Sequence, residues 1–360
     1  MFRINHISLT QFRNYAQKTF DLNHRIIAVC GMNGSGKTNL LDAIHYLCFT
    51  KSYFGKTDMV SSMIGLLGFN ITGEFLKEDQ SIQVSVILRE NNKKELFVDK
   101  QVVSPFSTHI GKFPIVFIAP DDISLITESS EERRKMMDTI ISQTDQEYLS
   151  TLIRYNKCLQ DRNRYLKSLE GRIPDELLID TFDEQLIQYG TIILEKRKTF
   201  LSDFLPLTLD LYGYISSSSE KPVLTPIFST QPENYGIDLK KSRQRDLMLQ
   251  RTSVGIHKDE IEMALMDNAF KQMASQGQKK SLLFALKLAE FEYLKKHFGV
   301  PPILLLDDIF EKLDQQRLNQ LLIWVGQKNE GQVILTDTHL ERVKKSLEDI
   351  SLPFQLINPS

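Results

Sequence analysis

The sequence predicts an α/β fold that is interrupted by a helical insertion. Residues 1–121 contain several β-branched or alternating segments and one amphipathic helix at 38–49. Residues 122–222 instead carry apolar residues at helical spacing, in two long helices on either side of the segment EGRIPDE. Residues 223–360 return to alternating strands and helices. We therefore expect two α/β segments, at 1–121 and 223–360, to form the two parts of one head, and the inserted lobe to contain a short antiparallel helical hairpin.

Composition and charge narrow the possible classes of protein. With 360 residues, of which 41% are hydrophobic, the chain can bury a substantial core. Its formal net charge of -2 argues against a globally basic surface, so any nucleic-acid site must be a local patch. No segment approaches the roughly 18 apolar residues of a membrane span, and the N-terminal sequence lacks the pattern of an export signal. We expect a cytoplasmic protein that does not span a membrane.

The three cysteines, Cys30, Cys48 and Cys158, are widely separated and have no metal-ligand spacing. We expect reduced thiols that pack in the interior, and no zinc site.

The segment GMNGSGKT matches the phosphate-binding pattern G-x-x-x-x-G-K-[ST]. It follows an apolar strand and opens the amphipathic helix, which is the context that the pattern requires. Its residues are Gly31, Met32, Asn33, Gly34, Ser35, Gly36, Lys37 and Thr38. Glycines let the backbone N–H groups face a phosphate, Lys37 would reach the β and γ phosphates, and Thr38 would bind Mg²⁺. A simple strand-to-helix turn is the alternative, and the context disfavours it.

A second motif is PPILLLDDIFEKLD at 301–314. Two prolines precede an apolar strand that ends in Asp307 and Asp308, where open α/β sheets bind ligands. We expect Asp307 to hold Mg²⁺ and Asp308 to orient or activate water. A solvated strand end would look the same in isolation, but the phosphate-binding motif upstream favours a catalytic site.

The segment ASQGQKKSL at 274–282 supplies a small polar loop before a helix. Ser275, Gln276, Gly277 and Gln278 offer a hydroxyl, a close backbone approach and N–H donors at a positive helix end. One ATP needs one phosphate loop, so this second loop is expected to serve the ATP of another subunit. Alternatively, Ser275 and Gln278 form only a capping box.

The order of these motifs resembles the heads of ATP-binding-cassette (ABC) ATPases, in particular the SMC-like DNA-repair branch and its RecF family. The segments that carry the resemblance, besides the three motifs, are FRNY at 12–15, FIAPDDISLI at 117–126, EERRKMMD at 131–138, YNKCLQDRNRYLK at 155–167 and TSVGIHKDE at 252–260. The resemblance covers nearly the whole chain. It implies an ABC-type, SMC-like P-loop ATPase head that binds ATP and Mg²⁺ and forms an ATP-dependent homodimer.

The resemblance also implies a function. Proteins of this kind recognise gapped or single-strand/double-strand junction DNA and, with RecR and RecO, help to load RecA in recombinational repair. Slow ATP hydrolysis resets the dimer. The rival hypothesis is an ABC-type ATPase subunit that acts as an ATP-switched scaffold without recognising DNA itself.

Individual roles follow by matching motifs. Ser275, Gln276, Gly277 and Gln278 would reach the partner's γ-phosphate. Asp308 stands where cassette ATPases usually have glutamate, so we expect turnover well below the roughly 10 per second that is typical of enzymes. Asp314 resembles the aspartate that lies at the dimer interface after the strand ending in Asp307. His339 resembles the switch histidine of the family. Equally, His339 could be only an exposed polar residue of a loop.

Other segments are less clear. The resemblance implies that Arg13 and Asn14 lie close to the nucleotide. Alternatively, the two residues only form a turn at an edge strand. The chain departs from the family pattern at Ile256, Lys258 and residues 50–58. These departures affect the expected DNA contacts rather than the ATPase.

Basic residues gather at two places in the helical insertion: Arg133, Arg134 and Lys135, then Arg154, Lys157, Arg162, Arg164 and Lys167. Arg154, Lys157 and Arg164 share one face of a helix. Such a face is usually only solvated, but the resemblance favours phosphate contacts. We therefore expect these three residues to contact DNA.

Overall fold

The computed structural model of the chain describes residues 2–55, 57–216, 221–309, 314–349 and 351–359. They form two compact units, the first comprising Met1–Ile123, Asp210–Ser218 and Ser275–Ser360, the second Ser124–Leu209 and Ser219–Ala274. Residues 223–274 thus cluster with the helical unit rather than with the head. The division expected from the sequence, at 1–121, 122–222 and 223–360, stays a proposal.

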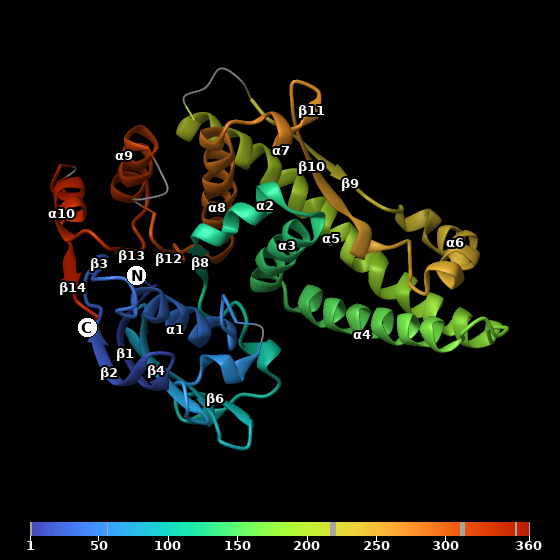
Figure 1. The fold of residues 1–360 in the computed structure, drawn as a ribbon, viewed down its shortest axis with the longest axis horizontal. Helices are drawn as coiled ribbons and strands as arrows, with labels where there is room; N and C mark the ends of the chain where they lie inside the picture. The colour runs from blue at the N-terminus through green and yellow to red at the C-terminus, as the bar shows by residue number, and fades with distance from the viewer. Residues whose placement is uncertain (1, 56, 217–220, 310–313, 350, 360) are drawn as a thin grey trace. The chain divides into compact units, whose positions relative to one another are not determined.

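An antiparallel sheet occupies the N-terminal part of the first unit (Figure 1). Its order is β2-β1-β4-β5-β6-β7, with β1 at Phe2–Phe12, β2 at Tyr15–Asp21, β4 at Phe69–Lys77, β5 at Gln80–Leu88, β6 at Lys94–Val98 and β7 at Gln101–Val102. Along β1 the buried residues alternate with partly exposed ones for most of its length, because one face of the sheet packs on the core.

The second sheet of this unit is parallel in every pairing. Its order is β14-β3-β13-β12-β8, with β14 at Gln355–Ile357, β3 at Ile26–Cys30, β13 at Val333–Asp337, β12 at Ile303–Leu306 and β8 at Ile115–Ile118. Every residue of strands β3, β8, β12 and β13 is buried. This explains their continuous apolar sequences, since both faces of a parallel sheet are covered.

The longer helices of the first unit are α1 at Lys37–Phe49, α8 at Gln276–Phe298, α9 at Gln315–Ile323 and α10 at Leu340–Glu348, and shorter ones are η1 at Asp58–Ser61, η2 at Phe106–His109, η3 at Pro120–Ile123 and η6 at Trp324–Lys328. The helix expected at 38–49 is therefore confirmed. One hydrophobic core contains residues of α1 together with residues of both sheets. Helix α1, which follows the phosphate loop, thus packs against both sheets.

The second unit is mostly helical. Its elements are α2 at Ser124–Thr127, α3 at Ser130–Thr144, α4 at Gln146–Ser168, most of α5 at Glu176–Ser216, β9 at Val223–Ile227, η4 at Pro232–Asn234, α6 at Tyr235–Leu249, η5 at Ile256–Lys258, β10 at Glu260–Leu265, β11 at Asn268–Ala269 and α7 at Phe270–Met273. Strands β9, β10 and β11 form a small antiparallel sheet.

Helices α4 and α5 form the antiparallel hairpin that the sequence predicts (Figure 1). Arg162 near the end of α4 pairs with Asp183 near the start of α5 at 2.9 Å, and Glu147 at the other end of α4 pairs with Lys196 at 2.7 Å. Helix α5 continues to Ser216, through Pro206, so it is longer than the sequence pattern suggested. The run of serines and glutamate that follows α5, residues 217–220, lies outside the described residues.

In the described parts of the chain, no helix has both the length and the apolar character to cross a membrane. Cys30, Cys48 and Cys158 are free thiols in the interior, as expected.

Candidate nucleotide site

The phosphate loop connects buried strand β3 to helix α1. Gly34 and Gly36 have φ angles of 80° and 108°, in the left-handed region that favours glycine. A side chain at Gly36 would also collide, because a Cβ there would lie 2.5 Å from the hydroxyl of Tyr15. The two glycines of the motif therefore serve the backbone geometry that lets N–H groups surround a phosphate.

The FRNY segment supports this loop from β1 and β2. Tyr15 donates a hydrogen bond to the carbonyl of Gly36 at 3.0 Å, and Asn14 donates to the carbonyl of Gly34 at 3.3 Å. Burial raises the pKa of the Tyr15 phenol, so it remains a donor. Sequence reasoning did not identify Tyr15; its hydroxyl becomes relevant only when β2 is placed against the loop.

Arg13 has a structural task of its own. It occupies the two-residue turn between β1 and β2 at a φ of 54°, and its guanidinium pairs with buried Asp42 at 3.0 Å. The same group donates to the hydroxyl of Ser52 at 2.9 Å. Asn14, not Arg13, is the residue of this turn that hydrogen-bonds to the phosphate loop.

Lys37 folds back over the phosphate loop. Its ammonium donates to the carbonyls of Gly31 at 2.8 Å and Met32 at 3.0 Å, and the side chain is largely buried. A lysine ammonium has three donors, and two of them hold it across the loop here. The cation is therefore positioned where the loop would receive a phosphate.

Thr38 joins the two expected catalytic motifs. Its hydroxyl lies 3.0 Å from each carboxylate oxygen of Asp307, which follows β12. Thr336 of β13 donates to the same carboxylate at 2.7 Å. Burial raises the pKa of Asp307, while the hydrogen bonds from Thr336 and Thr38 act in the opposite direction.

These oxygens are of the kind that Mg²⁺ prefers, and Mg²⁺ commonly uses one or two protein groups together with waters and phosphate oxygens. No group of three or more His, Cys, Asp or Glu side chains suited to a metal ion occurs within the described residues. The hydroxyl of Thr38 and the carboxylate of Asp307 fit a magnesium ion that is completed by a nucleotide.

Asp308 lies next to Asp307 in a left-handed conformation, with a φ of 50°. Its backbone N–H donates to the hydroxyl of Thr336 at 2.9 Å. Thr336 therefore links both aspartates, and sequence reasoning missed it because β13 pairs with β12 only in the folded sheet.

The ASQGQKKSL loop has the geometry of a capping box. Ser275 accepts a hydrogen bond from the N–H of Gln278 at 3.2 Å, and the side chain of Gln278 accepts one from the N–H of Ser275 at 2.7 Å. The structural alternative for this loop is thus realised within the chain. The capping box does not exclude a binding role for the loop, because Ser275 and Gln276 remain exposed at the start of α8.

The first turn of α8 and the segment after β12 line the same cavity, which has a volume of about 270 Å³. Gln276 and Lys280 line it from α8, and Asp307 and Ile309 line it from the segment after β12. The loop after β8, in the FIAPDDISLI segment, forms another wall. The first turn of α8, the segment after β12 and the loop after β8 therefore share one cavity in this unit.

Asp314 is the N-cap of α9, and its side chain accepts a hydrogen bond from the N–H of Arg317 at 3.0 Å. Arg317 also pairs with Asp314 through its guanidinium, donates to Ser281 of α8 at 2.7 Å, and packs against Gly277. Arg317 therefore connects Asp314 with the ASQGQKKSL loop, and no sequence motif pointed to it. The residues between Ile309 and Asp314, which complete the expected EKLD segment, lie outside the described residues.

His339 follows β13 and precedes α10. The end of β13 is in register with the end of β3, with Asp337 opposite Cys30, so His339 lies at the same edge of the sheet as the phosphate loop. Its side chain is 66% exposed, and its ring lies 2.7 Å from the hydroxyl of Thr338. A switch role and an exposed loop residue both remain compatible with this position.

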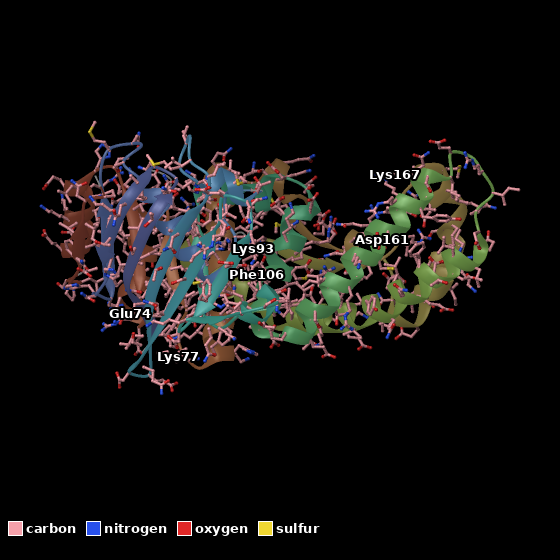
Figure 2. The ribbon with its side chains drawn as sticks, turned by 90° about the horizontal axis from the view of Figure 1, so that it is seen from below. Glu74, Lys77, Lys93, Phe106, Asp161 and Lys167 are labelled. Atoms are coloured by element: carbon pink, nitrogen blue, oxygen red, sulfur yellow. The ribbon has the colours of Figure 1, made fainter. Side chains whose placement is uncertain are left out.

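The expected DNA contacts lie on α4 of the second unit. Arg154, Lys157 and Arg164 are all exposed. Arg164 forms an ion pair with Asp161 at 3.0 Å. Figure 2 shows Asp161 and Lys167 on this helix.

Arg162, counted among the basic residues of the same helix, is not a surface cation. It is fully buried between Asp183 at 2.9 Å and Asp246 at 2.8 Å. The helical pattern hid this because Arg162 takes a core position that an apolar residue would ordinarily fill.

The residues of the first basic cluster, Arg133, Arg134 and Lys135, also have partners within the protein. Arg133 pairs with Glu260 at 2.8 Å, and Lys135 pairs with Glu131 and Glu132 of its own helix. Arg134 donates to the backbone carbonyl of Asp259 at 2.7 Å.

Known proteins are similar to this chain over most of its length. A family model described as an AAA domain matches residues 6–351. The DNA replication and repair protein RecF of Flavobacterium johnsoniae is 38% identical over 356 residues, which cover 99% of each chain.

Solved structures extend the comparison to the fold. A structure described as the recombination mediator protein RecF-ATP in the RecFOR pathway has a TM-score of 0.86 and 29% identity, covering 94% of this chain and 92% of that chain. An Smc head bound to the C-terminal winged-helix domain of ScpA has a TM-score of 0.55 and 16% identity, covering 94% of this chain and 90% of that chain, and indicates a shared fold alone. With its P-loop head, its inserted helical hairpin and a relative that matches it end to end, the chain belongs to the RecF family.

Proposed function

We propose that this chain is an ATP-dependent DNA-binding repair protein that dimerises on ATP and hydrolyses it slowly. The hydrogen bond between Thr38 and Asp307 carries the proposal, because it joins the phosphate loop to the catalytic strand in one site. Similarity to the RecF-ATP structure supports ATP as the nucleotide.

The residues of the site fit ATP with Mg²⁺. Bound ATP would supply the phosphate groups and Mg²⁺ the charge that neutralises them. Gly31 to Thr38 would hold the phosphates, and Thr38 and Asp307 would hold the metal ion. Asp308 orients water in this proposal, and its side chain, one methylene shorter than glutamate, supports slow turnover.

The exposed loop at Ser275 supports a composite site in a homodimer. In this proposal Ser275, Gly277 and Gln278 of one subunit contact the nucleotide of the other, and Asp314 lies at the same interface. A helix start with exposed donors suits the negative charge of a partner's γ-phosphate.

The family resemblance supports the biological role. The proposed target is gapped or single-strand/double-strand junction DNA, the proposed partners are RecR and RecO, and the outcome is loading of RecA in recombinational repair in the cytoplasm. The RecFOR pathway named for the solved relative is consistent with these partners.

Measurement of molecular mass in solution with ATP, with ADP and without nucleotide tests the composite site. We expect dimers with ATP alone. The Ser275→Arg variant should bind ATP as a monomer like the wild type but should not dimerise, because the larger side chain blocks the partner's phosphate.

Three results would contradict parts of the proposal. A monomer under all three conditions would exclude the ATP-dependent dimer. Loss of monomeric ATP binding in Ser275→Arg would reduce the loop to a capping box. A dimer that fails to shift gapped DNA would favour the ATP-switched scaffold instead.

A further inference from the structure

The TSVGIHKDE segment, residues 252–260, is held rigidly in the second unit. Asn163 of α4 accepts hydrogen bonds from the N–H and the hydroxyl of Thr252, at 2.7 and 2.8 Å. Further along, His257 lies 2.9 Å from the hydroxyl of Tyr155, also on α4. The segment therefore runs along α4, antiparallel to it.

Gly255 locks the middle of this segment. Its φ is 131°, and a Cβ there would lie 2.5 Å from the hydroxyls of both Tyr155 and Tyr235. The carbonyl of the next residue, Ile256, accepts a hydrogen bond from buried Arg197 at 2.6 Å. A backbone held at so many points loses little conformational entropy when a ligand binds.

Two cations, Arg251 and Lys258, flank the rigid part of the segment, and both are exposed. Arg245 on α6 is exposed as well. Among the residues that the structure describes, these three side chains form no ion pair, in contrast to the buried arginines of the same unit.

The cations lie near one another in the fold: Arg134 donates to the carbonyl of Asp259, next to Lys258, at 2.7 Å, and the N–H of Arg251 donates to the carbonyl of Asp246, next to Arg245, at 3.1 Å. After partial burial, the groups that lower the pKa of Lys258 are Arg251, Arg134 and Arg245. The cluster thus gathers like charges from α3, α6 and the 252–260 segment.

Neighbouring acids are already committed to other cations. Asp246 pairs with Arg162 at 2.8 Å, and Asp259 pairs with Arg197 at 2.8 Å. Glu260 pairs with Arg133. Asp246 still raises the pKa of Lys258, but less than each of the three arginines lowers it, so an external anion would relieve the remaining repulsion.

We propose that Arg134, Arg245, Arg251 and Lys258 form a phosphate-binding surface for the DNA backbone. The proposal rests on the DNA binding proposed above, and it adds a second set of contacts to those expected of Arg154, Lys157 and Arg164 on α4. Preformed cations on a rigid segment suit sequence-independent contacts with phosphates. Lys258, where the family pattern has arginine, keeps the charge that such a contact needs.

Fluorescence anisotropy of the full chain with ATP and a labelled gapped duplex, over a series of salt concentrations, tests this surface. Lys258→Gln and Arg251→Gln should each weaken binding roughly five-fold at about 0.15 M salt and reduce the salt slope by about 0.9. Lys258→Arg should bind like the wild type. Lys240→Gln, which removes an exposed cation of α6 outside the cluster, is the matched control and should also bind like the wild type.

The outcomes separate this inference from the proposed function. If the wild type binds DNA and both glutamine variants keep its affinity and salt slope, the surface is wrong and the function stands. If the wild type does not bind DNA, the proposed function fails. If Arg245→Gln and Arg251→Gln lower only the melting temperature, these cations stabilise the C-terminal end of α6, and the inference is overturned.

Discussion

At the scale of single residues, Gly36 illustrates how closely the phosphate loop is supported by β2. Its φ of 108° excludes most side chains, and the space where a Cβ would lie is taken by Tyr15 and Asn14. Gly34, two residues earlier, has a similar backbone conformation, with a φ of 80°, but no atom within 4 Å of the Cβ position. A side chain at Gly34 would therefore meet backbone strain alone, whereas a side chain at Gly36 would meet both backbone strain and a steric collision.

Replacing each glycine with alanine tests this distinction. Gly34→Ala should cost about 1 kcal/mol of unfolding free energy, from strain alone. Gly36→Ala should cost about 2–3 kcal/mol and weaken ATP binding at least ten-fold, because Tyr15 and the loop must move. Chemical denaturation and nucleotide titration measure the two effects, and equal losses in both variants would contradict the supporting role of Tyr15.

At the scale of elements, α8 is connected to two other segments by a buried charged cluster. Lys287 of α8 donates to the hydroxyl of Tyr53 at 3.2 Å and lies 3.6 Å from Asp122 and from Glu290. Tyr53, from the segment after α1, donates to Asp122, which in turn accepts from the N–H of Ala119 at 2.8 Å. The helix that begins at Ser275 is thus linked to the loop after β8.

This cluster has more acids than its one lysine can neutralise. Burial raises the pKa of Glu290 above its ordinary value of 4.5, although the positive charge of Lys287 acts in the opposite direction. The folded protein therefore holds a proton that the unfolded chain releases as the pH rises above 4.5. Glu290 thus lowers the unfolding free energy as the pH rises from 4.5 to its raised pKa in the folded protein, and above that pKa the loss stays constant.

The Glu290→Gln variant has no proton to release at this position. Its unfolding free energy, measured by chemical denaturation from about pH 5 to about pH 8, should fall less with pH than that of the wild type. Glu90→Gln, an exposed change in the same unit, serves as control and should keep the wild-type profile. Identical profiles for Glu290→Gln and the wild type would show that Glu290 is ionised in both states.

At the scale of the whole molecule, each unit has its own polar interior. In the first unit, buried Gln332 accepts from the N–H of Ile4 at 2.9 Å and donates to the carbonyls of Ile4 and Leu22, each at 2.9 Å, joining residues near the two ends of the chain. In the second unit, Arg162 neutralises Asp183 and Asp246. The partners named here belong to the same unit as the residue that they contact.

Arg162→Met should therefore destabilise the helical unit selectively. Buried Asp246 would lose its cation, whereas Asp183 would keep Arg243 at 2.7 Å, and breaking a buried pair typically costs about 3–5 kcal/mol. Hydrogen exchange should show faster exchange in α4 and α6 and unchanged protection in α1. Arg164→Met, on the exposed side of the same helix, should change neither. Equal loss of protection in α1 would mean that the two units unfold together.

The sequence by itself determined the elements that depend on contiguous residues. The phosphate loop, the strand before Asp307, the helix start at Ser275 and the hairpin could be predicted because each is a local pattern of backbone and side-chain types. The order of these motifs also indicated the family, which the comparisons confirm. The roles of the individual site residues stay predictions.

Only the tertiary structure decided which residues meet across the chain. The spacing of Arg162 resembled that of a surface cation, yet α5 and α6 enclose it with two carboxylates. Tyr15, Thr336 and Arg317 acquire their partners through a strand pairing or helix packing that no local pattern encodes. Lys258 gains its cationic neighbours in the same way, from three separate elements. Burial and long-range contacts set the charge environment of a side chain, and these depend on the complete fold.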